Sequence, residues 1–172
     1  MRATIIAASP GVGKSYLGRK HKNVLDLESS PFRYAGAGLE ELSAEERKGL
    51  NHLGGENPRW PQNYIDALLE NIDLYDIVLI PPPHENFKAQ EIWDYLATHN
   101  IKAFIAVPSI ESLETVFARM QGRSNKFIAY MRESYPLLLE ELKTNKSFYN
   151  IIKILDGEFL EDTLIRLGFV LV

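Results

Sequence analysis

Short apolar runs alternate with longer amphipathic stretches along most of this chain. The apolar runs lie at residues 3–8, 23–27, 76–80, 102–107 and 150–155. Several of them lack polar alternation, as buried parallel strands do. Amphipathic helices are predicted between them at Lys14–His21, Pro61–Leu74, Phe87–His99, Ile110–Gln121, Lys126–Lys143 and Phe159–Leu167. This alternation predicts an α/β fold in three layers, with a mostly parallel five-stranded sheet covered by helices on both faces.

Residues 29–60 follow the second predicted strand and are rich in glycine, serine and charged side chains. Within them, Ser43 is followed three residues later by Glu46, a capping-box spacing that predicts a short helix. A long insertion at such a place is more often a binding loop or a lid than a linker. We therefore predict a single domain over residues 1–172, with 29–60 as an inserted binding segment.

The amino-acid composition limits which binding partners and which cellular compartment are expected for this protein. The 172 residues, 45% of them hydrophobic, are enough for one core and few for two. A net charge of -4 gives no overall basic field, so nucleic acid is not an expected partner. The absence of cysteine excludes disulfides, thiolate metal sites and cysteine nucleophiles. No apolar stretch approaches the ~20 residues that span a bilayer, and we expect a cytoplasmic protein without a membrane partner.

The stretch Ser9–Ser15 reads Ser-Pro-Gly-Val-Gly-Lys-Ser, between the first predicted strand and the first predicted helix. With Ala8 it fills the pattern Gly, four residues, Gly-Lys-Ser/Thr, except at the first position. Gly11 and Gly13 allow successive N–H groups to face one point, where the helix also begins. Lys14 would reach phosphate groups there. The alternative is a glycine-rich turn with a surface lysine; Ala8 favours it, because a methyl group is costly where φ must be positive.

The Pro-Gly at the centre of this loop resembles the form found in adenylate kinase and other nucleoside monophosphate kinases of the P-loop superfamily. The order of predicted elements is similar to that superfamily along nearly the whole chain. The segments VLDLESSPF, NPRWPQNYIDAL and VFARMQGRSNKFI also resemble small, mostly uncharacterised nucleotide-kinase-like proteins of bacteriophages and prophages. The resemblance implies strand order 2-3-1-4-5, ATP and Mg2+ as cofactors, and phosphoryl transfer to a small acceptor, foremost a (deoxy)nucleoside monophosphate.

The resemblance also assigns residues to the donor. The residues expected to hold the nucleotide are Ser9, Pro10, Gly11, Val12, Gly13, Lys14, Ser15 and Tyr16. Ser15 is the expected metal-binding residue, through its hydroxyl. Motor-type ATPases carry a further acid at the end of a strand, but here Pro81 follows the third strand and Asp76 lies at its start. An acid at that start would face away from the chemistry, which gathers at the carboxyl ends of the strands.

On the acceptor side, nucleotide kinases place contacts after the second strand, so 29–60 becomes the inserted acceptor-binding segment. Asp26 is a candidate to orient an acceptor hydroxyl or hold a water on Mg2+, or else it simply ends a strand. Trp60 and Tyr64, four residues apart, either stack on a base or close the insertion onto the core. The expected substrate-binding residues are Glu28, Ser29, Ser30, Arg59, Trp60, Asn63, Tyr64 and His84.

Arg119 and Arg123 leave the helix predicted over 110–121, whose apolar face is Ile110, Leu113, Val116 and Phe117 after a capping Ser109. They resemble the lid arginines of nucleotide kinases, which makes 119–126 a lid-like segment that Arg132 would join. Guanidinium groups suit phosphate oxygens. With Lys14 and Asp26, the two arginines are the expected catalytic residues. The alternative is a pair of exposed arginines at a helix C-terminus, where the dipole favours them.

Two other functions stay open from the sequence. One is a nucleotide-binding regulatory or interaction protein with little turnover, which Ala8 and the missing strand-end acid favour. The other is a P-loop kinase or ATPase with a non-nucleotide acceptor. A zinc site is not expected, because His84-Glu85 is followed by Lys88 where the zinc-helix motif requires a second histidine.

Overall fold

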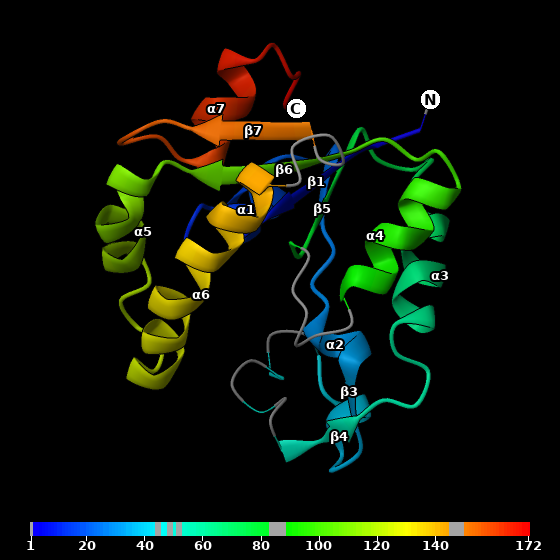
Figure 1. Ribbon diagram of the computed structural model, residues 1–172. Helices are drawn as coiled ribbons and strands as arrows, with labels where there is room; N and C mark the ends of the chain where they lie inside the picture. The colour runs from blue at the N-terminus through cyan, green and yellow to red at the C-terminus, as the bar shows by residue number, and fades with distance from the viewer. Residues whose placement is uncertain (1, 44–45, 48–49, 51–52, 83–88, 145–149) are drawn as a thin grey trace.

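The computed structural model of the chain describes residues 2–43, 46–47, 50, 53–82, 89–144 and 150–172 (Figure 1). Its main sheet contains β1 (Thr4–Ala8), β2 (Val24–Asp26), β5 (Ile77–Ile80), β6 (Ala103–Pro108) and β7 (Asn150–Ile154). The strand order is β2-β5-β1-β6-β7, and every neighbouring pair is parallel. When the five strands of this sheet are numbered in chain order, as in the prediction, their spatial order is 2-3-1-4-5. The predicted parallel sheet and its order are confirmed.

The helices fall where the periodicity predicts them. They are α1 (Lys14–Lys20), α3 (Gln62–Asn71), α4 (Ala89–Thr98), α5 (Leu113–Arg119), α6 (Asn125–Thr144) and α7 (Leu160–Arg166). One stretch differs, because the segment before α5 is a 3-10 turn, η4 (Ile110–Ser112), capped by Ser109. Its tighter winding rotates Ile110 out to solvent, so Ile110 is not on the apolar face.

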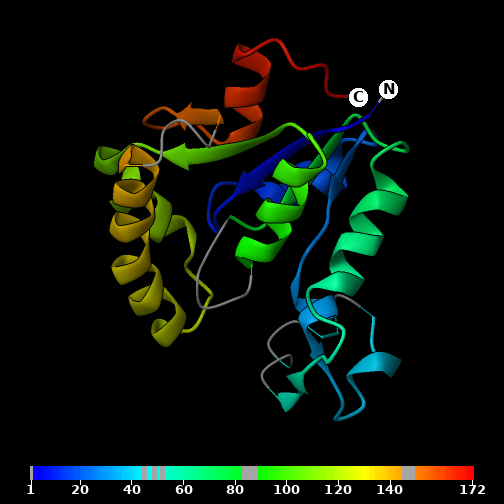
Figure 2. The ribbon, with the colours of Figure 1, turned by 45° about the vertical axis from the view of Figure 1, so that its right-hand side comes forward.

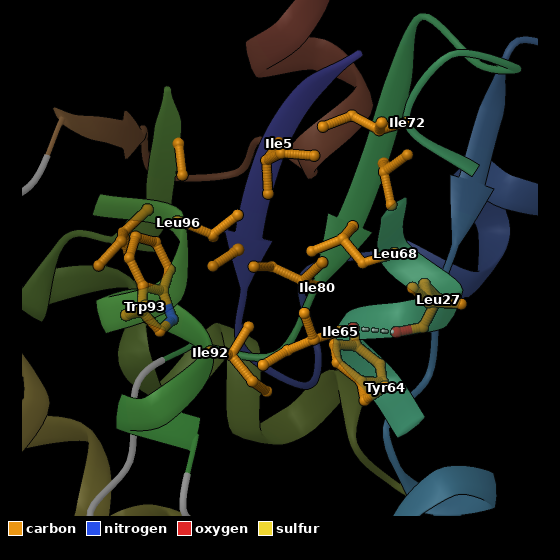
Figure 3. Close-up of a cluster of buried hydrophobic side chains, with 14 of the residues drawn as sticks. Ile5, Leu27, Tyr64, Ile65, Leu68, Ile72, Ile80, Ile92, Trp93 and Leu96 are labelled. Atoms are coloured by element: carbon orange, nitrogen blue, oxygen red, sulfur yellow. Dashed lines mark hydrogen bonds between the residues drawn. The ribbon is translucent and has the colours of Figure 1, made fainter. Parts of the chain in front are cut away.

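Buried side chains form one cluster on each face of the sheet, because successive strand residues point to opposite faces. Ile5 and Ala7 of β1 belong to the cluster under α3 and α4, which Figure 3 shows. Ile6 and Ala8 belong to the cluster under α1, α5 and α7, and α6 packs residues into both. The sheet therefore lies between two helical layers, as predicted.

The insertion after β2 has structure that the sequence does not predict. It contains α2 (Ser30–Arg33), β3 (Tyr34–Ala35), η1 (Leu39–Glu41) and β4 (Gly55–Glu56), and β3 pairs antiparallel with β4. Figures 1 and 2 show it projecting from the end of the molecule opposite the two chain termini.

The capping box predicted inside the insertion has its hydrogen bonds. The Ser43 N–H donates to Glu46 Oε2 at 2.9 Å, and the Glu46 N–H donates to Ser43 Oγ at 3.3 Å. Residues 44–45 and 48–49 of the predicted helix lie outside the described residues.

Among the described residues, no helix combines the length and apolar character needed to cross a bilayer.

Candidate functional site

An open cleft of about 420 Å³ lies where the carboxyl ends of the strands meet. Its lining comes from the segments that follow β1, β2, β5 and β7, together with residues 119–127. Parallel strands bring these segments to one edge of the sheet, which is where ligands bind in open α/β folds. The cleft is therefore the candidate site.

Residues 9–15, here named the glycine loop, form the floor of this cleft with Pro10, Gly11, Gly13 and Lys14 among its lining. Gly11 and Gly13 have φ of +86° and +102°, values that L side chains rarely adopt. A Cβ on Gly11 would lie 2.8 Å from Met120 Cε. The positive φ favours glycine at Gly11, and a side chain there would also force the Met120 side chain to move.

The carbonyls of the glycine loop are bound by the surrounding scaffold. The Tyr135 hydroxyl donates to the Pro10 carbonyl at 3.0 Å, and the Leu160 N–H donates to the Val12 carbonyl at 2.9 Å. The N–H groups of residues 11–15, by contrast, donate no hydrogen bond within the described part of the chain. Unpaired N–H groups in a tight turn form a concave donor surface that suits an anion.

Ala8, the departure from the phosphate-loop pattern, is the last residue of β1. It is fully buried in the core and pairs with Ala106 of β6. Its φ is not positive, because Ala37 and Asn100 are the positive-φ residues other than glycine in the described chain. The methyl group therefore meets none of the strain that the sequence analysis attached to it.

Opposite charges gather beside the glycine loop. Burial lowers the pKa of the Lys14 ammonium, an effect that Asp26 and then Glu28 oppose and Arg123 reinforces. Burial likewise raises the pKa of the Asp26 carboxyl, against the attraction of Lys14. The Ser15 hydroxyl donates to Glu28 Oε1 at 3.4 Å. An ammonium, a hydroxyl and two carboxylates thus share one corner of the site.

These groups fit a magnesium ion that arrives with phosphates. Mg2+ keeps several waters and is held by one or two protein oxygens together with the phosphate groups of its substrate. Asp26 Oδ1 is buried without a hydrogen-bond partner among the described residues, and Ser15 is adjacent. No group of three or more histidines and acids that could cage a metal by themselves occurs in the described chain.

Arg119 lines one wall of the cleft and is fastened to the loop before α7. Its guanidinium donates to the Glu158 carbonyl at 2.8 Å and to the Gly157 carbonyl at 3.0 Å. It also stacks 3.8 Å above the ring of Phe159. Arg123 lines the same wall, 5.7 Å from the Phe127 ring centroid. The structure therefore brings both predicted arginines to the glycine loop.

The lining also includes residues that the sequence analysis did not select. Phe127 and Phe159 are the main ones. Phe159 is 45% exposed, which is high for a large apolar ring. The available signal was its position between the last strand and the last helix, on the edge of the sheet that gathers ligand contacts. Met120, Leu27, Pro81 and Pro82 complete the unselected lining.

The predicted donor and acceptor residues divide between the cleft and the interior. The predicted residues that line the cleft are Pro10, Gly11, Gly13, Lys14, Ser15, Tyr16, Glu28, Ser29, Ser30, Arg119 and Arg123. Ser9 and Val12 belong to the glycine loop but are buried and do not line the cleft. Arg132 pairs with Glu114 on α5 through its second guanidinium nitrogen at 2.8 Å, and it does not line the cleft. His84 lies outside the described residues.

The predicted residues at the start of α3 are not in the cleft lining. Trp60 and Tyr64 are buried in the core, and the Tyr64 hydroxyl donates to the Leu27 carbonyl at 2.7 Å (Figure 3). The Asn63 amide donates to the Phe32 carbonyl at 2.8 Å, and Arg59 pairs with Asp66 at 3.1 Å. Of the two interpretations of Trp60 and Tyr64, this burial supports closure of the insertion onto the domain.

Comparison with known proteins gives a likeness in structure but none in sequence. No protein-family model matches the chain, and no curated protein matches it by sequence. The solved structure of the Deinococcus radiodurans tunicamycin resistance protein is similar to it, with a TM-score of 0.53 and 19% identity over 99% of both chains. At this identity the likeness concerns the fold, which the two chains share along their full lengths.

Proposed function

We propose that this chain is a phosphotransferase that moves the γ-phosphoryl group of Mg-ATP to a small acceptor, with the glycine loop as a P-loop phosphate cradle. The observation that carries the proposal is the row of N–H groups at residues 11–15, beside Lys14, which have no acceptor among the described residues. Phosphoryl transfer needs positioning and charge neutralisation more than covalent help. The cleft offers three cationic side chains and the Glu28 carboxylate for that purpose, and Asp26 lies near Lys14.

Each group has a defined part in this proposal. The N–H groups and Lys14 bind the donor phosphates, and an anion at this place favours the charged form of the buried ammonium. Ser15 and the phosphates would hold Mg2+, with Asp26 in reach of its waters; the ion supplies further charge neutralisation. Arg123, and Arg119 on release from the loop before α7, bind the charge that develops on the transferring group.

The base of the nucleotide has an apolar wall to lie against. Phe127 and Phe159 both line the cleft on the side of Arg119. An aromatic ring stacks on a base without regard to its identity. We therefore place the nucleoside of ATP on this wall and the acceptor on the opposite wall, beside Glu28, Ser29 and Ser30.

The acceptor expected from the sequence is a (deoxy)nucleoside monophosphate. A non-nucleotide acceptor is the main alternative, and the structural neighbour, named for tunicamycin resistance, makes tunicamycin one compound to include in a test. A nucleotide-binding role with little turnover is favoured by the residue after β5, because Pro81 occupies the position where motor-type ATPases carry an acid. Asp26 and Glu28 place carboxylates near Ser15 from another strand, which favours turnover.

The test is transfer of the γ-phosphoryl group from labelled ATP, with and without Mg2+, to a panel of nucleosides, their monophosphates and tunicamycin. We expect Mg2+-dependent transfer, lowered at least ~100-fold in Lys14→Ala because the buried cation facing the phosphates is lost. Lys102→Ala is the matched control, since Lys102 is exposed and does not line the cleft.

Equal ATP binding and turnover in the wild type and Lys14→Ala would contradict the proposal. Binding of Mg-ATP that depends on Lys14 but leads to no turnover would instead favour the regulatory role.

A further inference from the structure

The two arginines that line the cleft stand on one side of it, whereas Lys14 follows the central strand β1. Lys14 belongs to the glycine loop, and Arg119 and Arg123 belong to the lid-like segment. No other lysine or arginine occurs among the described residues that line the cleft. In the sheet order, the loops after β6 and β7 lie on this side of β1, and the loops after β2 and β5 lie on the other.

The wall formed after β2 and β5 has a different chemistry. Its polar side chains are Glu28, Ser29 and Ser30, and Leu27 and two prolines supply its apolar surface. Within the described chain, this wall presents a carboxylate and two hydroxyls but no cation. It can therefore bind hydroxyl groups and a carbon skeleton, while Glu28 repels an anion.

The described arginines of the inserted segment do not line this wall, because each contacts another group nearby. Arg47 is buried and donates to the Tyr34 carbonyl at 2.7 Å. Arg59 pairs with Asp66 on α3 at 3.1 Å. Arg33 lies 5.2 Å from the Tyr34 ring centroid. None of the three lines the cleft, whereas a phosphate monoester needs arginine or lysine partners to offset its desolvation.

We propose that the acceptor is a neutral alcohol, a hydroxyl compound without a phosphate group, and that Glu28 receives the proton of its attacking hydroxyl. This inference rests on the proposed function and departs from the monophosphate expected from the sequence. Glu28 lines the cleft, and its carboxylate meets the Ser15 hydroxyl, so it stands next to the phosphate end of the donor.

The step is balanced in atoms and charge. The acceptor oxygen forms a bond to the γ-phosphorus, and the bond from that phosphorus to the β–γ bridging oxygen breaks. The electron pair of the broken bond leaves on ADP. The hydroxyl proton passes to Glu28 and then to solvent, which the exposed carboxylate can reach. The products are a phosphate monoester of the alcohol, ADP and one proton.

The test compares each acceptor with its own phosphate. Uridine, thymidine, adenosine, ribose and tunicamycin are offered beside the matching 5′-phosphates of the nucleosides and of ribose, with labelled Mg-ATP. We expect label on the neutral compounds, and at least about 10-fold less on the matched phosphates. Glu28→Gln should lower transfer to the neutral acceptor about 100-fold or more and leave the KM for Mg-ATP within about 3-fold, because a general base acts on the acceptor alone.

Glu70→Gln is the matched control, because Glu70 is an exposed glutamate on α3 outside the cleft. Faster transfer to a monophosphate than to its nucleoside would overturn this inference and leave the proposed function standing. Transfer to none of the neutral compounds, with Lys14-dependent ATP hydrolysis intact, would also overturn it. Loss of ATP binding and turnover altogether would instead remove the proposed function and the inference with it.

Discussion

Asp26 shows the site at the scale of a single residue. It ends β2 behind Lys14, and the polypeptide closes tightly over it, since a Cβ on Gly18 would lie 3.0 Å from the Asp26 Cβ. Burial raises the pKa of Asp26 even though Lys14 is near. The ionised form of Asp26 therefore lowers the stability of the folded protein. Destabilising groups of this kind are concentrated at functional sites.

We predict that Asp26→Asn is more stable than the wild type at pH 7, by about 1 kcal/mol, and less active in phosphoryl transfer. The folded-state pKa is raised, so the ionised wild-type residue destabilises the fold above that pKa. The stability advantage of Asn should shrink as the pH falls through the folded-state pKa of Asp26, and vanish below its ordinary pKa of 3.8, where the folded and unfolded states both hold the proton.

Urea unfolding of both variants across this pH range measures the difference. Asp73→Asn serves as the control, since Asp73 is exposed. Lower stability of Asp26→Asn at pH 7 would show that its ionised form supports the fold.

At the scale of elements, α6 links the lid-like segment to the glycine loop. The helix begins at Asn125, within the last residues of that segment, and Tyr135 is buried ten residues later with its hydroxyl on the Pro10 carbonyl. Met120 packs on Gly11 from the same side. The glycine loop is thus shaped from outside by elements that are more than 100 residues away in the chain.

We predict that Tyr135→Phe weakens Mg-ATP binding about 5-fold, because one hydrogen bond that holds the Pro10 carbonyl is lost at a typical net value near 1 kcal/mol. Calorimetric titration well below the melting temperature separates this effect from stability. Tyr95→Phe on α4 is the matched control, because Tyr95 does not line the cleft. An unchanged Kd in Tyr135→Phe would mean that the loop keeps its shape without this bond.

At the scale of the whole molecule, the insertion is joined to the sheet by an aromatic contact. Trp60 and Tyr64 lie 5.7 Å apart by ring centroid, and Phe32 of α2 meets Tyr64 edge-on at 5.3 Å. The Tyr64 hydroxyl, whose pKa burial raises well above its usual range, binds Leu27 at the edge of the cleft. The same side chains therefore pack the insertion onto the sheet and support the acceptor wall of the cleft.

We predict that Trp60→Ala destabilises the protein by about 3–5 kcal/mol, because a large ring that is 5% exposed leaves a cavity. Chemical denaturation measures this loss, and Trp60→Phe should recover part of it. The Kd for Mg-ATP of the folded fraction should stay within about 3-fold. A Trp60→Ala variant with wild-type stability but a raised KM for the acceptor would restore the base-stacking role expected from the sequence.

The sequence by itself determined the class of fold and the glycine loop. Apolar runs and helical periodicity located β1, β5, β6 and α6 within one or two residues, because these signals are local and the core selects them directly. The glycine loop was visible for a related reason, since its positive-φ positions and lysine follow one another in the chain. The order of the strands came from the resemblance to a superfamily.

Only the tertiary structure decided which side chains share the cleft and which fill the core. Trp60 and Tyr64 have a spacing that suits either a ligand face or a packed face, and their burial in the core cluster that α3 and α4 cover decided between the two. Phe159 and Glu28 come from opposite ends of the sequence and meet at one edge of the sheet. Their proximity follows from the order of the strands in the sheet. That order is set by packing between segments far apart in the chain, which no local sequence pattern reveals.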